Sequence, residues 1–241
     1  MDKRYRKRRA AAVIFSMFLF CFAILVNTLN QEANQENVAS NLSKEEGIVL
    51  SSTDSKLAID ALGELVIKGR APKTGYSREE FGSGWATNSG CDTRNIILNR
   101  DLIETKFDKQ CYVLSGKLND PYTGRTIVFV RGTDTSGDIQ IDHVVALGDA
   151  WQKGAQLLTK ERRIELANDP LELLAVDGNS NLDKSDGDAA TWLPSNKSFR
   201  CKYVARQIAV KQKYALWITQ AEYDAMKVVL NNCPAQILPN P

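Results

Sequence analysis

The chain has 241 residues, 43% hydrophobic and 25% charged, a balance that excludes a fully disordered protein and allows an ordinary buried core. Its formal charge of +2 arises in the first nine residues, "MDKRYRKRR", which hold six Lys or Arg and one Asp. The rest carries 25 basic and 28 acidic side chains, which excludes a generally basic protein and limits nucleic-acid contact to a local patch.

The N-terminal segment is typical of an exported protein. An unbroken apolar run, "AAAVIFSMFLFCFAILV" at residues 10–26, follows the basic residues. Its length fits both a cleaved signal peptide and a short uncleaved membrane anchor, so both interpretations stay open for residues 1–28. In either case the positive flank stays in the cytoplasm and the rest of the chain is delivered outside.

The remaining chain is predicted to be one domain behind a linker. Residues 29–53 are rich in Asn, Gln, Glu and Ser, a composition that predicts a disordered segment. Residues 54–241 show no internal repeat and no second shift in composition, and we expect them to form a single domain.

The predicted elements of this domain alternate between helices and strands, so the fold class is α+β. A helix over residues 55–66 is followed by a loop-built layer at 70–95 and by strands at 125–132 and 137–145. A helix capped by Thr159 leads to a strand at 171–176 and a brief helix at 189–195. Two longer helices, at 200–215 and 219–231, complete the chain.

Cysteine usage predicts two disulfides. Four cysteines lie outside the apolar run and contain no C-x-x-C pair, as expected for an oxidising compartment: Cys91, Cys111, Cys201 and Cys233. Three pairings are open from the sequence. We favour Cys91–Cys111 with Cys201–Cys233, because these pairs close short local loops.

The only histidine, His143, follows Asp142 at the end of the alternating run "QIDHVV". If this run and "LLAVDGNSNLDK" form a β-hairpin followed by a helix, Asn181 and Lys184 converge on the same place. Carboxylate and amide oxygens suit a hard divalent cation, and an imidazole can take a proton from water. Phosphodiester hydrolysis needs these parts. The alternative is that a lone histidine is structural, and that Asp142 and Asn181 are turn or cap residues.

Several motifs carry a resemblance to a known family. The stretches "IDHVVALGDAW", "ANDPLELLAVDGNSNLDKSDGDAATWLP" and "RCKYVARQIAVKQKYAL" resemble the HNH (His-Me finger) endonucleases, in particular their secreted bacterial branch. "GYSREEF", "GCDTRNIIL" and "DPYTGRTIVF" are similar to the same branch, so the resemblance covers roughly residues 57–233. It implies a ββα-metal finger embedded in a mixed, disulfide-stapled domain, and a bacterial protein that is secreted or anchored to the outer face of the membrane.

The resemblance also implies roles for individual residues. His143 matches the general base, Asp142 and Asn181 match metal ligands, and Lys184 lies three residues further on, where it can orient the site. The implied cofactor is a divalent metal ion, Mg²⁺ first, with Mn²⁺ or Ca²⁺ as alternatives.

One position departs from the family pattern. The middle Asn of the motif, which buttresses the base, falls at Glu172 in "DPLEL". A carboxylate there can accept a hydrogen bond from the imidazole and raise its pKa, or it can approach the metal instead. Asn168 and Asn179 are the alternative buttress residues.

A nucleic-acid-binding surface is predicted after the site, where the chain has six basic residues and no acid: Lys197, Arg200, Lys202, Arg206, Lys211 and Lys213. The alternative is a solvated helix face. Arg94, close to Cys91, is predicted either to bind phosphate or to pair with Asp92 or Asp101. No base-reading motif is present, so we expect little sequence specificity.

The leading hypothesis is an exported, metal-dependent endonuclease acting on DNA, with RNA as a second substrate. The rival is a non-catalytic, membrane-tethered, extracellular DNA-binding module in which Glu172 marks the decay of an active site. A nuclease toxin is a third interpretation, disfavoured because no delivery domain is recognised. Nucleic acid is the expected partner, with the membrane through residues 1–28 if they are uncleaved, and no protein partner is expected.

Overall fold

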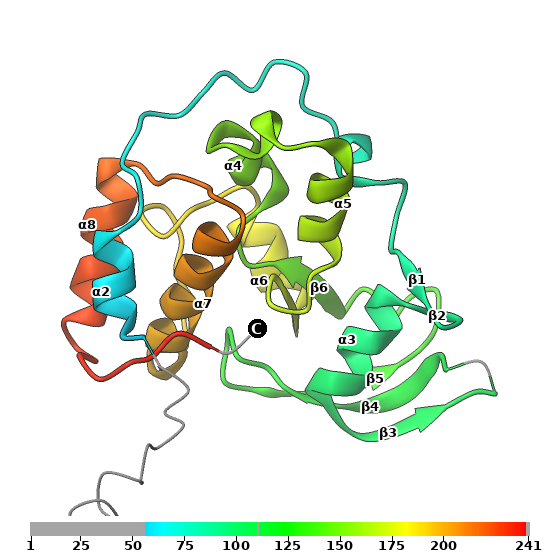
Figure 1. Ribbon diagram of the computed structural model, residues 1–241. Helices are drawn as coiled ribbons and strands as arrows, with labels where there is room; N and C mark the ends of the chain where they lie inside the picture. The colour runs from blue at the N-terminus through cyan, green and yellow to red at the C-terminus, as the bar shows by residue number, and fades with distance from the viewer. Residues whose placement is uncertain (1–55, 110, 240–241) are drawn as a thin grey trace, which may run out of the picture. The chain divides into compact units, whose positions relative to one another are not determined.

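The computed structural model describes residues 56–109 and 111–239 (Figure 1). These residues form three small antiparallel sheets, with helices packed around them. The predicted signal or anchor (1–28) and the predicted linker (29–53) lie outside the described residues. The described residues fall within one compact unit, Ser55–Pro241. Across these two described ranges, the structure has no helix whose length and apolarity would let it cross a membrane.

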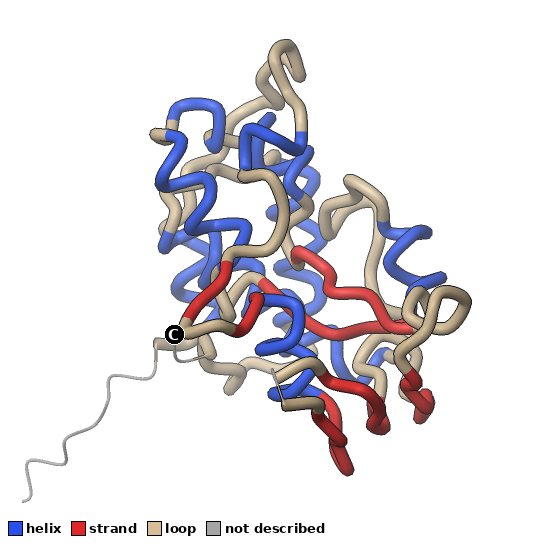
Figure 2. The backbone as a smooth tube through the Cα atoms, turned by 90° about the vertical axis from the view of Figure 1, so that its right-hand side faces the viewer, coloured by secondary structure: helices blue, strands red, loops and turns tan. Residues whose placement is uncertain are grey.

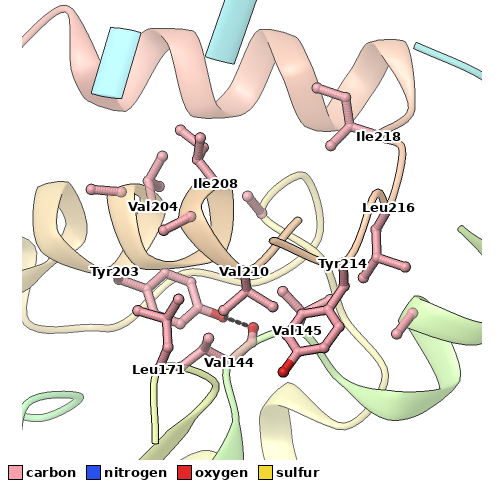
Figure 3. Packing of buried hydrophobic residues seen from close by; sticks show 14 of the residues in the cluster. Val144, Val145, Leu171, Tyr203, Val204, Ile208, Val210, Tyr214, Leu216 and Ile218 are labelled. Atoms are coloured by element: carbon pink, nitrogen blue, oxygen red, sulfur yellow. Dashed lines mark hydrogen bonds between the residues drawn. The ribbon is translucent and has the colours of Figure 1, made fainter. Parts of the chain in front are cut away.

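Three helices pack against one another at one end of this unit: α2 (Ala58–Gly63), α7 (Arg200–Lys213) and α8 (Gln220–Leu230) (Figure 1). The larger hydrophobic cluster includes side chains of all three helices and reaches the chain just after the strand that carries His143. Figure 3 shows Tyr203 and Val210 of α7 close to Val144 and Val145, with Leu171 beside them. Because α7 buries this apolar face, it fixes the chain immediately after His143.

A three-stranded antiparallel sheet forms a second layer, seen with the other strands in Figure 2: β3 (Leu102–Phe107), β4 (Val113–Asn119) and β5 (Thr126–Val130). Helix α3 (Thr93–Asp101) covers it, and Ile97, Leu98 and Phe129 lie in the smaller hydrophobic cluster. A two-stranded ribbon, β1 (Thr87–Asn88) with β2 (Cys91–Asp92), leads into α3.

Strands β6 (Ile139–His143) and β7 (Leu173–Asp177) pair antiparallel, with Asp142 opposite Leu174 and His143 opposite Leu173. The connection between them holds α4 (Leu147–Gln152), the 3-10 helix η2 (Ala155–Leu157) and α5 (Lys160–Asn168). Helix α6 (Gly178–Lys184) follows β7 directly. Two further 3-10 turns, η1 (Arg78–Phe81) and η3 (Lys197–Phe199), precede β1 and α7.

Most of the predicted elements are present. The strands expected at 125–132, 137–145 and 171–176 are β5, β6 and β7, and Thr159 caps α5 by accepting a hydrogen bond from the Arg162 N–H. The two C-terminal helices are α7 and α8. The fold is therefore of the α+β class, as predicted.

Three local predictions were wrong. Residues 189–195 form no helix, and 189–191 are a turn, because the Asp188 carboxylate accepts a hydrogen bond from the Ala190 N–H, which competes with helix formation. The first helix ends at Gly63, well before residue 66. The layer at 70–95 ends in the start of α3, whose N-terminus is capped by Asp92 through the Asn95 N–H.

The predicted disulfide pairing is confirmed. Cys91–Cys111 joins β2 to the segment before β4, and Cys201–Cys233 joins the first turn of α7 to the segment after α8. Each bond closes a local loop, with sequence separations of 20 and 32 residues, and so restricts the unfolded chain more than it shapes the site.

A buried ion cluster connects the helices behind the site. Lys153 is fully buried, and its Nζ lies 2.7 Å from Asp149 Oδ1, 2.7 Å from Asp188 Oδ2 and 2.6 Å from Glu222 Oε2. The cluster also includes Lys211 and Arg70. Three cations thus face three carboxylates, as the burial of charge requires.

Candidate active site

The end of β6 and helix α6 bring the predicted site residues together. Helix α6 begins directly after β7 because Asp177 accepts hydrogen bonds from the Ser180 N–H and hydroxyl, both at 2.8 Å. The helix therefore starts beside β6, and the Lys184 ammonium reaches the Asp142 carboxylate at 2.9 Å and the His143 carbonyl oxygen at 2.8 Å. The convergence expected from the sequence is present in the structure.

Asp142 is a buried carboxylate with two fixed donors. Besides Lys184, the hydroxyl of Tyr122 donates to its other oxygen, Oδ2. Burial raises the pKa of Asp142, while the Lys184 charge and the Tyr122 hydroxyl oppose that rise. Tyr122 itself is fully buried, and burial raises its pKa well above the usual range, so it stays a hydroxyl donor.

His143 is held in one tautomer. Its Nε2 lies 3.0 Å from the Ala167 carbonyl oxygen, which can only accept, so Nε2 carries the proton. No described residue bonds to Nδ1, whose lone pair is therefore available. Burial lowers the pKa of His143 to about 3; the Ala167 bond opposes this effect, and the charges of Arg78 and Lys184 add to it. The imidazole is neutral at pH 7.

A loop from before β1 covers the imidazole. The Trp85 ring stacks on His143, with centroids 5.6 Å apart and planes 12° from parallel. The next residue, Ala86, donates its N–H to Asn168 Oδ1 at 2.8 Å, and Asn168 Nδ2 donates to the Ile164 carbonyl at 2.9 Å. Asn168, one of the two alternative buttress residues, thus supports His143 indirectly, by positioning the Trp85 loop.

Glu172 does not contact the imidazole, which differs from the expected hydrogen bond. Both of its carboxylate oxygens accept from the Val145 N–H at 3.2 Å, and its backbone carbonyl accepts from the Val144 N–H at 2.9 Å. Because β7 pairs Leu173 with His143, the Glu172 side chain lies beyond the ring and beside the following residues. Burial raises its pKa well above the usual range. It braces the backbone after the base.

Helix α7 holds the same stretch from the other side. The Val144 carbonyl accepts hydrogen bonds from Gln207 Nε2 at 2.8 Å and from the Tyr203 hydroxyl at 3.4 Å, the latter drawn as a dashed line in Figure 3. Backbone groups on both sides of the chain after His143 are therefore satisfied by buried side chains.

Two hollows flank His143. A hollow of about 250 Å³ is lined by Asp142, His143 and Asn181 among others. A second hollow of about 470 Å³ is lined by His143, Trp85 and the loop at residues 82–84. Arg78 and Leu147 line both hollows. His143 is thus part of the lining of both hollows.

Asp142 and Asn181 are the candidates for holding a metal ion. Asn181 donates through Nδ2 to Gln140 Oε1 at 2.8 Å, which leaves its Oδ1 without a partner among the described residues, and the residue lines the hollow shared with Asp142. The Asp142 carboxylate keeps lone pairs beyond the two that Tyr122 and Lys184 use. The described residues contain no group of three or more His, Cys, Asp or Glu that could hold a metal. Two oxygen donors fit Mg²⁺, which usually retains several waters.

The predicted basic surface does not form one face. Lys211 is fully buried, 3.0 Å from Glu222 Oε1, so its assignment to nucleic-acid binding was wrong. Arg206 is half-buried and donates through Nη1 to the Leu171 carbonyl at 3.0 Å. Both side chains point inward because α7 packs its apolar face on the core and draws their stems with it.

The remaining basic residues of this segment differ in their contacts. Arg200 donates to the Pro194 carbonyl at 2.7 Å. Lys213 is exposed but lies 2.6 Å from Asp169. Lys197 and Lys202 are exposed, and neither has a partner among the described residues. The ammonium groups of these two lysines are therefore free to meet phosphate.

Arg94 supports the chain that leads into β6. Its guanidinium donates to the carbonyls of Ser136 and Ile139, each at 3.0 Å. It pairs with neither Asp92 nor Asp101, and burial lowers its pKa. The ion pair with Asp92 or Asp101 is therefore absent because Nη2 donates to the carbonyls before β6, while phosphate binding by Arg94 stays a prediction.

Sequence reasoning missed three side chains at the site: Tyr122, Trp85 and Arg78. Tyr122 lies in the turn between β4 and β5, where no periodic pattern marks a buried residue. Trp85 and Arg78 lie far from His143 in sequence, and only the motif "GYSREEF" drew attention to that region. Their proximity to the base is a product of the tertiary fold.

Comparison with known proteins gives a family and a relative. Residues 92–229 match the family described as the C-terminal domain of GmrSD restriction endonucleases, a range that includes Asp142, His143 and Asn181. A protein of Arthroderma benhamiae named "Uncharacterized secreted protein" is 38% identical over 175 residues, which cover 71% of this chain and 82% of that protein. No solved structure matches the chain. Because this relative is fungal, it does not confirm the expected bacterial branch.

Proposed function

The chain belongs to the family of GmrSD restriction endonuclease C-terminal domains, and from this premise we propose that it is an exported HNH-type endonuclease that hydrolyses phosphodiester bonds in DNA. The family is named after restriction endonucleases, so membership implies nuclease activity and a nucleic-acid substrate. RNA is a second substrate of the same chemistry.

The tautomer of His143 is the observation that carries this proposal. Its Nε2 proton is fixed on the Ala167 carbonyl, no described residue bonds to Nδ1, and His143 lines the same hollow as Asp142 and Asn181. A water at Nδ1 gives its proton to the ring while its oxygen forms a bond to phosphorus. The P–O3′ bond breaks, and the departing oxygen takes a proton from solvent. The negative substrate phosphate raises the low pKa of His143 towards the working range of a base.

The HNH type is supported by the order of elements around the base. The two antiparallel strands β6 and β7 are followed by α6, with Asp142 and His143 at the end of the first strand and Asn181 on the helix. This is the arrangement that the resemblance to the ββα-metal finger implies.

Asp142 and Asn181 would hold the divalent metal ion, with Lys184 keeping the Asp142 carboxylate in place. When bound there, Mg²⁺ or a similar ion would stabilise the charge that develops on the phosphate and the departing oxygen. Lys197 and Lys202 remain the predicted contacts to the nucleic-acid backbone.

Export is supported by three independent features. The relative of Arthroderma benhamiae is named a secreted protein. Basic residues followed by an apolar run open the chain, as in a signal peptide or anchor. Two disulfides form between four of the five cysteines, which is typical of proteins in an oxidising compartment.

Cleavage of supercoiled plasmid by the purified, oxidised protein tests the proposal, with Mg²⁺ or Mn²⁺ and with EDTA. Wild-type protein is expected to nick the plasmid only with metal, and His143→Ala to be about 10²–10⁴-fold slower, because it lacks the general base. Asn181→Ala, which keeps the base, is expected to need more Mg²⁺ for its half-maximal rate. Thermal unfolding of each variant shows whether its fold is intact.

Two results would overturn the proposal. The first is a folded His143→Ala variant that cuts at the parental rate. The second is intact plasmid under every metal condition, from protein with both disulfides formed. DNA binding that persists in EDTA without cleavage would favour the non-catalytic binding module instead.

A further inference from the structure

Arg78 is an arginine without a partner at the mouth of the site. Its side chain is exposed and makes no hydrogen bond or ion pair with any described residue. Among the arginines of the described ranges, only Arg125 shares this condition, since the guanidinium groups of the others bond to carbonyl or carboxylate oxygens. An unpaired positive charge next to a candidate base is suited to bind an anionic ligand.

The backbone beneath Arg78 is firmly held. Arg163 donates to the Glu80 carbonyl at 3.0 Å and to its carboxylate at 2.6 Å, which ties η1 to α5. Phe81 is buried and makes an edge contact with Trp151, with ring centroids 6.2 Å apart. The Arg78 side chain is therefore free, but the position from which it extends is fixed.

Arg78 and His143 line both hollows, so they stand at the boundary between them. A phosphodiester that crosses this boundary would present its phosphorus to the base and its non-bridging oxygens to the guanidinium. The hollows on either side would receive the two nucleosides that the phosphate joins.

We propose that Arg78 is a catalytic residue that binds the non-bridging oxygens of the scissile phosphate, an inference that rests on the proposed nuclease function. A guanidinium offers two parallel N–H donors in the geometry of phosphate oxygens. It strengthens its hold as negative charge grows on those oxygens during attack, so its effect falls on the rate of the chemical step.

The test compares four proteins on supercoiled plasmid with Mg²⁺: wild type, Arg78→Ala, Arg78→Lys and Arg125→Ala. Arg125 is the matched control, since it is equally exposed and unpartnered but lines a different hollow, at the ends of β5 and β7. Arg78→Ala is expected to lower kcat about 10²–10³-fold. Arg78→Lys, which keeps the charge without the fork, should fall between, and Arg125→Ala should cut at the parental rate.

A binding measurement separates the two proposals. Fluorescence anisotropy of a labelled DNA duplex in EDTA, at several salt concentrations, should give Arg78→Ala a salt dependence weaker by about one phosphate contact. If wild type cuts and Arg78→Ala cuts equally fast, the role of Arg78 is overturned and the nuclease proposal stands. If wild type does not cut, both proposals fail.

Discussion

His143, Asp142 and Glu172 lie together at the buried ends of β6 and β7, and burial acts on them in opposite directions. It lowers the pKa of the imidazole and raises the pKa of both carboxyl groups. The neutral form is favoured in each case. The Asp142 carboxylate accepts hydrogen bonds from Lys184 and Tyr122, whereas the Glu172 carboxylate accepts one from the Val145 N–H. Their roles follow from this difference.

The contacts of Glu172 give a prediction about its role. Glu172→Gln keeps an acceptor for the Val145 N–H and is close in shape to a neutral carboxyl group, so plasmid cleavage should stay near the parental rate. Glu172→Leu leaves that N–H buried and unpaired, and should lower the free energy of unfolding by about 1–3 kcal/mol. Urea unfolding of both variants, alongside cleavage assays, measures the two effects. A large loss of rate in Glu172→Gln would instead mean that Glu172 acts on the base.

The site could be predicted only where its residues share a local pattern. Asp142 and His143 end an alternating strand, and Asn181 and Lys184 lie on the helix after the next strand, so their convergence followed from a hairpin. Tyr122 and Trp85 come from turns that reach the site only through long-range packing. No spacing in the sequence encodes that contact.

At the scale of elements, alternation and capping were reliable guides. Strand β6 and helix α5, with its Thr159 cap, follow directly from local sequence. The helix expected at 189–195 failed because Asp188 holds the chain in turns, and it does so while bonded to Lys153. Tertiary contacts of a single carboxylate thus override local helix propensity.

Helix α6 depends on a close approach of two backbone segments. An added Cβ at Gly178 would lie 2.2 Å from the Gly137 carbonyl oxygen, and the Gly178 N–H donates to the Asp138 carbonyl at 2.9 Å. Only glycine fits without moving the loop before β6. The approach sets where α6 starts, and hence where Asn181 and Lys184 lie.

Gly178→Ala is therefore expected to destabilise the protein by about 1–3 kcal/mol, because the new methyl group must push two backbone segments apart. Cleavage should fall with it, since Asn181 moves relative to Asp142. The control is Gly63→Ala in α2, where nothing lies within 4 Å of the added Cβ and a gain of about 0.5–1 kcal/mol is expected. Thermal unfolding of both variants measures these changes in stability. Equal stabilities of Gly178→Ala and Gly63→Ala would contradict the proposed clash.

At the scale of the whole molecule, the buried ion cluster links α4, α7 and α8 to the turn at Asp188. Burial raises the pKa of Asp188, but the hydrogen bond and charge of Lys153 and the charge of Arg70 together outweigh this effect. The pKa of Asp188 is therefore lowered in the folded protein. A carboxyl group whose pKa is lowered in the folded state stabilises the protein at pH values above the pKa that the group has in the unfolded chain, about 3.9. That stability is lost as the pH falls through the lower, folded value.

Asp188→Asn should thus be destabilised most at neutral pH, by about 3–5 kcal/mol, because it leaves buried Lys153 with one partner fewer. The gap between wild type and Asp188→Asn should begin to narrow as the pH drops below about 4 and should close as the pH falls through the lower folded pKa, where folded wild-type Asp188 is protonated too. Denaturant titrations from pH 7 to pH 3 measure the gap. Asp183→Asn, at an exposed carboxylate, is the control, and a constant gap across this range would refute the linkage.

The single histidine gives this protein a built-in reporter. Because the chain has no other imidazole, every histidine ring signal in a proton NMR spectrum comes from the side chain beneath Trp85. The ring current of that indole would shift the signal, and the shift would disappear if the loop opened. One resonance thus reports the loop position, the protonation of the base and the arrival of a phosphate, with no label attached.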